Sequence, residues 1–190
     1  MNYTAGSERL NAYRREIAGI RERMRATLAE TEPQPVADYE FTTADGKVRL
    51  SELFGGFADL MVVHNMGTSC PACTMWADGY NGVHHHIASR TAFAVSSPDP
   101  PAVQQRFAAE RGWKFRMVSH IDSTFAADMG YRGAKGWRPG ISVFRRDGAR
   151  IVRVTDATWS PGDDFCTVWH FFDLLPDGAA GWKPKFSYPT

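Results

Sequence analysis

A pair of cysteines placed where an apolar strand passes into a helix constrains the fold more than any other feature. Leu60–His64 is a short apolar run typical of a buried strand, and a loop of small residues leads from it to Cys70-Pro71-Ala72-Cys73. Proline is favoured at the first helical position, so a helix is expected over residues 71–88. Such a strand–loop–helix unit predicts a layered α/β domain with the dithiol at the carboxyl edge of its sheet.

The rest of the chain continues this alternation of short strands and helices. Strands are predicted at residues 38–43, 48–53, 60–64, 91–96, 115–120, 141–146 and 150–155, and helices at 71–88, 101–111, 123–129 and 163–175. Asp45-Gly46 and Asp147-Gly148 are typical hairpin turns. We therefore expect one α/β domain with a mixed central sheet over residues 36–176. Residues 177–190 are rich in glycine and proline, which predicts an extended tail.

An amphipathic helical arm is predicted ahead of this domain, within residues 1–35. Apolar side chains recur at spacings of three and four between residues 7 and 30, at Leu10, Tyr13, Ile17, Ile20, Met24 and Leu28. Ser7 is the expected N-cap, and Pro33 and Pro35 end the helix. Two interpretations of the stripe stay open: it packs on the domain, or it pairs with a second copy and makes a homodimer.

Composition excludes several classes of function. The 190 residues carry a formal net charge of +1, and the basic residues of the arm alternate with glutamates, so no nucleic-acid surface is predicted. No apolar run is long enough to span a membrane, and no signal peptide is visible, so we expect a cytoplasmic protein without a membrane partner. Three cysteines do not form a disulfide framework, and in a reducing compartment a close pair is catalytic or metal-binding.

The dithiol has the geometry that a thiol nucleophile needs. Cys70 lies at the positive end of the predicted helix, which lowers a thiol pKa from about 8.5 toward about 7. Cys73 follows one turn later, within reach of a disulfide bond. The pattern predicts that Cys70 attacks a disulfide as a thiolate and that Cys73 resolves the mixed disulfide. A metal site and an inert pair are the alternatives.

The sequence also resembles the thioredoxin and peroxiredoxin superfamily, and in particular an uncharacterised bacterial branch of it. The resemblance covers about residues 8–175. The motifs that carry it are Asp38-Tyr39-Glu40-Phe41, Asp45-Gly46-Lys47, Leu50-Ser51-Glu52-Leu53-Phe54-Gly55, the dithiol, Trp76-Ala77-Asp78-Gly79 and Val143-Phe144-Arg145-Arg146-Asp147-Gly148. It implies a thioredoxin-like three-layer fold with a mixed central sheet, and no settled activity comes with the branch.

Three further positions gain a role from this resemblance. Pro139 resembles the cis-proline that faces the dithiol in thioredoxin folds, and Arg138 stands where peroxiredoxins often place a thiolate-stabilising arginine. His64, six residues before Cys70, matches the position of a buried acid in thioredoxins, and its imidazole would shuttle the proton of Cys73. The alternatives are a loop proline, a solvent-facing arginine and a packed core histidine. We also expect Trp76 and Trp137 to wall the dithiol.

One departure from the peroxiredoxin signature weakens a peroxidase interpretation. That signature asks for a threonine three residues before the reactive cysteine, but Gly67 precedes Cys70 and Cys70 precedes Cys73 at that offset. The sequence therefore predicts a thiol-disulfide oxidoreductase without a cofactor, acting on a disulfide-containing protein or a small thiol. A thiol peroxidase, a metal-binding protein and a redox-inert binding module are the rivals.

The histidine run and the third cysteine are expected to have no role in the chemistry. His84-His85-His86 could contribute to a metal site, but consecutive histidines on a helix point in three directions, so no metal is predicted. Cys166 stands alone and is expected to be a buried apolar residue.

Overall fold

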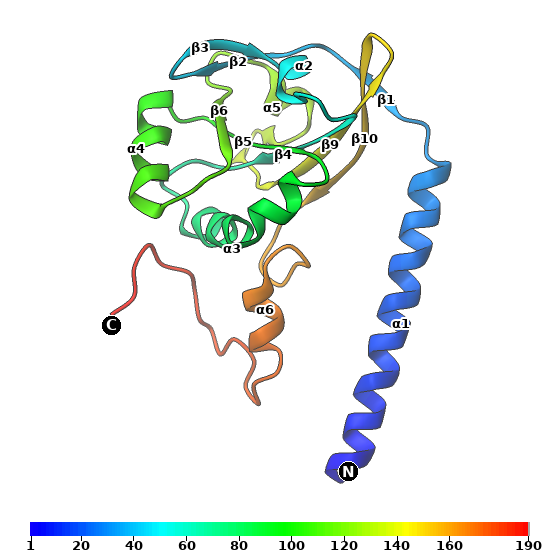
Figure 1. Ribbon diagram of the computed structural model, residues 1–190. Helices are drawn as coiled ribbons and strands as arrows, with labels where there is room; N and C mark the ends of the chain where they lie inside the picture. Colours follow the sequence, from blue (N-terminus) through cyan, green and yellow to red (C-terminus); the bar gives the residue numbers. More distant parts are fainter. Residues whose placement is uncertain (190) are drawn as a thin grey trace. The chain divides into compact units, whose positions relative to one another are not determined.

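The computed structural model describes residues 1–189 and divides the chain into two units, Met1–Gln34 and Pro35–Thr190. The first unit is the long helix α1 (Tyr3–Glu30), drawn in blue in Figure 1. It begins earlier than predicted, because Asn2 and not Ser7 is the N-cap: the Asn2 side chain accepts a hydrogen bond from the Ala5 N–H at 2.9 Å. The apolar stripe of α1 has no covering element within this unit.

The second unit is an α/β domain built on a mixed sheet. Its strands are β1 (Gln34–Val36, at the junction of the units), β2 (Glu40–Thr43), β3 (Gly46–Arg49), β4 (Asp59–His64), β5 (Ala92–Ser97), β6 (Arg116–Ser119), β9 (Gly140–Asp147) and β10 (Arg150–Thr158). They are ordered β1-β10-β9-β4-β5-β6-β2-β3, with β4, β5 and β6 parallel and β9 antiparallel to β4. The mixed central sheet predicted from the sequence is thus confirmed.

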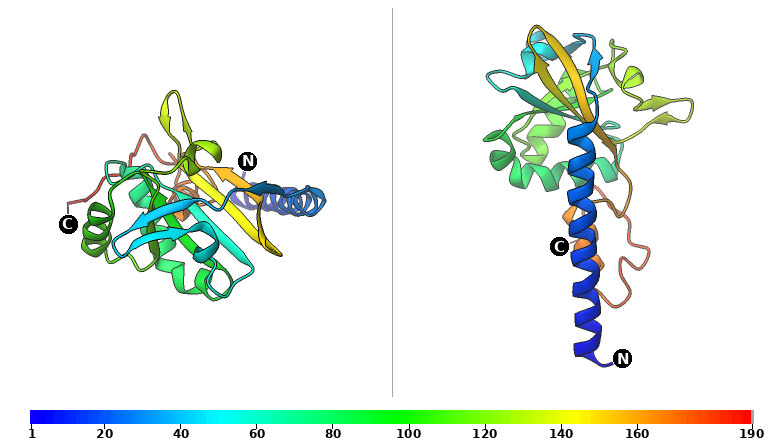
Figure 2. Two further views of the ribbon diagram at one scale, coloured as in Figure 1. Left: turned by 90° about the horizontal axis from the view of Figure 1, so that it is seen from above. Right: turned by 90° about the vertical axis from the view of Figure 1, so that its right-hand side faces the viewer.

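The helices of the domain are α2 (Leu50–Leu53), α3 (Pro71–Ala88), α4 (Pro101–Arg111), α5 (Phe125–Asp128) and α6 (Thr167–Phe172). Figure 1 shows α3 on one side of the sheet and α2 and α5 on the other. Two more strands, β7 (Arg132–Gly133) and β8 (Gly136–Trp137), form a separate hairpin that projects from the domain, in yellow-green in Figure 2. None of the described helices is long and apolar enough to cross a bilayer.

Each face of the sheet has its own core, and the alternation of side chains along β4 divides them. Leu60 and Val62 pack with residues of α2 and α5, including Phe125, and we call this the α5-side core. Val63 packs with residues of α3, including Trp76, and we call this the α3-side core. The dithiol helix therefore covers one face of the sheet only.

Two predicted elements are wrong, for reasons of packing. Residues 50–53 form a helical turn instead of continuing a strand, because Leu50 and Leu53 are both buried, and a spacing of three puts two side chains on one face of a helix. The last helix begins at Thr167 and not at 163, because the Asp163 carboxylate accepts hydrogen bonds from the backbone N–H groups of Ser160 and Phe165 and holds a loop.

Candidate functional site

The dithiol lies at the amino end of α3, as the sequence predicts. Cys70 is the N-cap residue, and its Sγ accepts a hydrogen bond from the backbone N–H of Cys73 at 3.1 Å. Pro71 occupies the first turn, where the missing N–H costs nothing. Both cysteines are free thiols, with Cys70 half-buried and Cys73 buried. The pair is therefore in its reduced form, with the first thiol the more accessible one.

The surroundings of Cys70 stabilise a thiolate. Its pKa falls from the ordinary 9.0 to about 7, chiefly because the Cys73 thiol donates a hydrogen bond to it. The backbone N–H groups of Cys73 and Ala72 add to this effect, while burial opposes it. A substantial fraction of Cys70 is then ionised near neutral pH, which is the state that attacks sulfur.

Cys73 has the opposite character. Its donation to Cys70 and its burial both raise its pKa far above the ordinary value, and the charge of Cys70 raises it further. Only backbone N–H groups, those of Met66 and Cys73, act in the other direction. Cys73 therefore stays protonated until Cys70 has given up its charge, which is the order of events that a resolving thiol requires.

An aspartate just after the next strand holds the loop that leads into the dithiol. The Asp99 carboxylate accepts a hydrogen bond from the backbone N–H of Thr68 at 2.8 Å, and the Thr68 hydroxyl lies 3.4 Å from its other oxygen. A side chain at Gly67 (φ +103°) would place its Cβ 3.0 Å from this carboxylate, so glycine is required there. Asn65 completes the loop by accepting from the Gly67 N–H at 2.8 Å.

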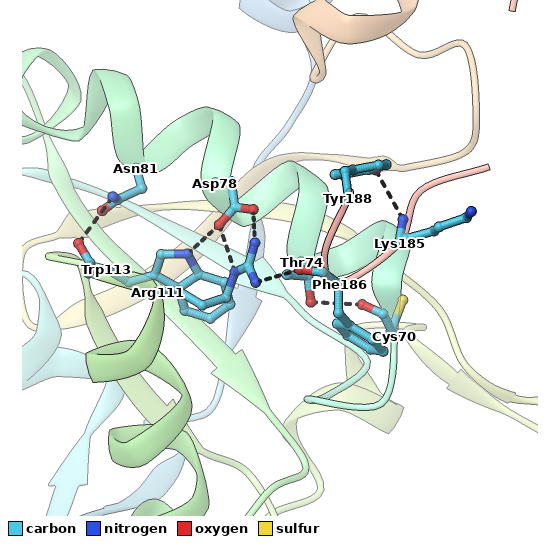
Figure 3. A network of polar contacts seen from close by, with 10 residues as sticks. Cys70, Thr74, Asp78, Asn81, Arg111, Trp113, Lys185, Phe186 and Tyr188 are labelled. Carbon is cyan, nitrogen blue, oxygen red and sulfur yellow. Dashed lines mark hydrogen bonds and ion pairs between the residues drawn. The ribbon is translucent and has the colours of Figure 1, made fainter. Parts of the chain in front are cut away.

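Figure 3 shows how the middle of α3 is fixed to the elements beside it. The Asp78 carboxylate forms an ion pair with Arg111 at the end of α4, and it also accepts from the Trp113 indole N–H at 2.8 Å. Arg111 donates in turn to the Phe186 carbonyl at 3.1 Å, and this contact ties the C-terminal segment to α4. Nearer the dithiol, the Thr74 hydroxyl donates to the Cys70 carbonyl at 3.0 Å. These contacts fix α3 and leave the Cys70 thiol itself out of the network.

His64 lies on the other face of the sheet. Its ring stacks on Tyr131 at 3.7 Å and on Phe125 at 5.1 Å, in the α5-side core, and its Nε2 lies 2.9 Å from the Ser142 hydroxyl. Burial, with the nearby His120 and Arg153, lowers the pKa of His64 well below its ordinary value, so the ring is neutral. None of the hydrogen bonds recorded for the described residues links His64 to Cys73. The shuttle role of His64 stays a prediction.

The expected cis bond before Pro139 is wrong. No peptide bond between described residues is cis, and the trans form is favoured by about 0.5–1 kcal/mol unless packing selects the other. The Arg138 N–H donates to the Tyr131 carbonyl at 2.8 Å, and the Pro139 carbonyl accepts from the Trp159 N–H at 2.9 Å. Both flanking hydrogen bonds are thus formed with the trans bond in place.

The other predicted site residues are dispersed. Arg138 is exposed, and Trp137 in the projecting hairpin packs 4.9 Å from the His120 ring with Arg132 over its face. Trp76 is buried in the α3-side core, where its indole N–H donates to Asp163 at 3.3 Å. The structure therefore brings together Cys70 and Cys73, with Trp76 one turn further along α3, and the binding roles of Arg138, Pro139 and Trp137 stay predictions.

The histidine run lies near the carboxyl end of α3, away from the dithiol at its amino end. His84 packs edge-on against Phe93, whereas His85 and His86 contact each other. Among residues 1–189, no group of three or more histidine, cysteine or acidic side chains is arranged to hold a metal ion. Cys166 is buried in the α3-side core, as expected, and burial raises its pKa.

Sequence reasoning missed three residues around the dithiol, namely Asn65, Tyr80 and Asp99. Asp99 could have been found, because it follows the strand after Leu60–His64, and the carboxyl ends of neighbouring parallel strands meet at one edge of a sheet. Tyr80 lies seven residues after Cys73, a spacing that places both on one helix face. Asn65 carried no signal beyond its place after the strand.

The mixed sheet, the helix that begins at the dithiol, and the helices on the opposite face define a thioredoxin-like fold of the kind found in peroxiredoxins. The bacterioferritin comigratory protein of Xanthomonas campestris, whose structural report concerns alkyl peroxide reduction, is similar with a TM-score of 0.53 and 17% identity over 63% of this chain and 79% of its own. Reduced Prx3 of Vibrio vulnificus is similar with a TM-score of 0.57 and 15% identity, over 70% of this chain and 89% of its own. Peroxidoxin BcpB of Mycobacterium tuberculosis is similar with a TM-score of 0.52 and 27% identity, over 63% of this chain and 80% of its own.

The family follows from the sequence itself. Residues 6–186 match the model of a family described as bacterial protein of unknown function (DUF899), so the chain belongs to that family. The predicted membership of an uncharacterised bacterial branch with a thioredoxin-like fold is thereby confirmed. Comparison with curated proteins gives no match.

Proposed function

We propose that this protein is a thiol-disulfide oxidoreductase in which Cys70 attacks and Cys73 resolves. The observation that carries the proposal is the unequal pair of thiols. Cys70 is accessible, with a pKa of about 7, whereas Cys73 is buried and protonated, with its thiol directed at Cys70. The order of attack and resolution follows from this inequality, because the thiolate is the nucleophile and the thiol behind it becomes acidic only once Cys70 is bonded to substrate.

The substrate class is a disulfide in a protein or a small molecule, and no cofactor is required. Thiolate attack forms a bond between Cys70 and one substrate sulfur and releases the other as a thiol. Cys73 then forms the Cys70–Cys73 disulfide and releases the second thiol, so two electrons pass to the substrate. The roles in binding that substrate are predictions for Pro139, Arg138, Trp76 and Trp137.

Thiol peroxidase activity is a second candidate, and the fold supports it. The similar structures are peroxiredoxins, and an accessible low-pKa cysteine reduces peroxides as well as disulfides. In this reaction one cysteine would be oxidised to a sulfenic acid while the peroxide is reduced to water or an alcohol. The other thiol would then condense with the sulfenic acid to a disulfide and release water. The two candidates differ in the oxidant and share the product.

One set of variants separates the candidates. Reduced protein is given an insulin disulfide in one assay and a peroxide in another, with Cys166→Ser as the control for unrelated thiol loss. The oxidoreductase proposal expects the protein to reduce the insulin disulfide faster than it consumes the peroxide. Cys73→Ser should accumulate a mixed disulfide through Cys70, and Cys70→Ser should trap nothing. Consumption of peroxide without insulin reduction would favour the peroxidase, and failure of both thiols to react faster than free cysteine would leave a binding module.

A further inference from the structure

Tyr80 is the polar side chain of α3 that shares a face with Cys73. Seven residues are close to two full helical turns, and Cys73, Ala77 and Tyr80 form a buried row along α3. Long aromatic side chains of a helix lean toward its amino end, which here directs the phenol toward the dithiol. Edge-on contacts with Phe93 at 5.4 Å and Phe115 at 5.0 Å hold the ring in place.

The hydroxyl of Tyr80 is buried, and no described residue forms a hydrogen bond of normal geometry with it. Three neighbours nevertheless act on its ionisation: Cys73 and Asp78, whose charges would disfavour a phenolate, and the Asn65 side chain, whose hydrogen-bonding action would favour one. A buried hydroxyl without a partner is costly, so a position of this kind calls for an explanation. The cost is recovered if a partner forms during the reaction.

Resolution of a mixed disulfide creates such a partner. Cys73 must lose its proton while buried near Tyr80, and its sulfur carries a negative charge until the bond to Cys70 forms. The substrate sulfur then leaves Cys70 as a thiolate and takes up a proton, which balances the one that Cys73 has lost. A hydrogen-bond donor already oriented in a dry site stabilises the transient charge more effectively than water does.

We propose that the Tyr80 hydroxyl is the hydrogen-bond donor that meets the Cys73 thiolate during resolution. The inference rests on the oxidoreductase function proposed above, and it adds the group that makes the second step fast. Burial, followed by the charge of Cys73, raises the pKa of Tyr80 well above its ordinary value. The phenol therefore stays protonated and acts as a donor, not as a base.

The other charged groups near this site do not supply the same hydrogen bond. Cys70 carries substrate at this stage, and the Met66 backbone N–H, which also acts on Cys73, is the same in every variant. Asp78 on α3 is engaged by Arg111 and Trp113. Asp163 accepts from the Trp76 indole and from two backbone N–H groups. A pH dependence that changes when the Tyr80 hydroxyl is removed therefore reports on the pair Tyr80–Cys73.

The test follows both steps in one experiment. Reduced protein is mixed with an aromatic nitrobenzoate disulfide, whose thiolate absorbs visible light, so attack by Cys70 and resolution by Cys73 each release one coloured thiolate. Tyr80→Phe keeps the ring and removes the hydroxyl. The first release should be unchanged, and the second should be roughly tenfold slower or more, with its pH midpoint moved upward by about one unit.

Tyr131→Phe is the matched control, because it also removes a buried hydroxyl. Tyr131 donates to the Ile141 carbonyl at 3.1 Å in the α5-side core. The Tyr131→Phe protein should therefore release both thiolates at the rates of the wild type. An unchanged second release in Tyr80→Phe overturns the inference and leaves the oxidoreductase function intact. Equal slowing of both steps also overturns it, because that result assigns Tyr80 to packing. A wild-type protein that releases a single thiolate overturns the proposed function and the inference together.

Discussion

Replacing Cys73 by alanine should make Cys70 a weaker acid. The pKa of Cys70 lies at about 7 against an ordinary 9.0, and the first of its causes is the hydrogen bond donated by the Cys73 thiol. One pH unit corresponds to about 1.36 kcal/mol, and solvent screening at the half-exposed Cys70 reduces what a single partner contributes. We therefore assign about one unit to the Cys73 thiol and leave the remainder to the two backbone N–H groups, which the substitution does not remove.

The assay is the pH dependence of alkylation by iodoacetamide, followed at each cysteine by mass spectrometry. The midpoint for Cys70 should lie at about 7 in the wild-type protein and about one unit higher in Cys73→Ala. Cys73→Ser is the matched variant, because its hydroxyl still donates to Cys70, and its midpoint should stay near that of the wild type. At about pH 6 the alanine variant should then react about tenfold more slowly.

The same pKa values predict a pH dependence of stability. The pKa of folded Cys70 is lower than its ordinary value, so its contribution to the free energy of unfolding is present above about 9 and is lost as the pH falls to about 7. The reduced wild-type protein should gain stability across that window, and Cys70→Ser should not. An alkylation midpoint that is the same in wild type and Cys73→Ala would refute the reasoning, because the backbone N–H groups alone would then account for the acidity.

Three more results are expected. Asp99→Ala should lower the free energy of unfolding by about 1–2 kcal/mol in chemical denaturation and speed hydrogen exchange at the Thr68 amide, and an unchanged exchange rate would contradict the clamp. If α1 pairs with a second copy, the double variant Ile17→Asp, Ile20→Asp should be a monomer in light scattering where the wild type is a dimer. An equal mass for wild type and variant would mean that the apolar stripe packs within its own chain. His64→Ala should lower the free energy of unfolding by about 2–4 kcal/mol through lost stacking; a slower second thiolate release would support the predicted shuttle role, and an unchanged one would assign His64 to core packing.

The parts of the fold that the sequence predicts well are those with local signals. The bounds of α3 and α4 agree with expectation, because each helix begins with a proline at its first position and α4 ends at Gly112 in the left-handed conformation. The turn sequence Asp147-Gly148 predicts the hairpin of β9 and β10. The dithiol was found because its chemistry depends on neighbours in the chain, the strand before it and the helix after it.

The parts that could not be predicted depend on contacts between distant segments. A one-residue difference decides which face of β4 receives a side chain, and this stacks the His64 ring against Tyr131 in the α5-side core. The trans bond before Pro139 is set by contacts of its neighbours with Tyr131 and Trp159, and the intrinsic preference is too small to decide it. The sequence showed only that Tyr80 lies seven residues after Cys73. The structure adds that the helix face the two share is buried.

The groups that stabilise Cys70 bear on which oxidant the proposed function would use. Its low pKa comes from the Cys73 thiol and from two backbone N–H groups, and no arginine is among its causes. Cleavage of a peroxide leaves a strongly basic oxygen, which needs a positive or acidic partner in the transition state. A substrate disulfide leaves a thiolate, which departs faster the lower its pKa and needs less help. Under the proposed function we expect a preference for disulfides, because Arg138 is exposed and is not among the groups that lower the pKa of Cys70, and a peroxide would have to rely on the Cys73 thiol, the same group that resolves the product.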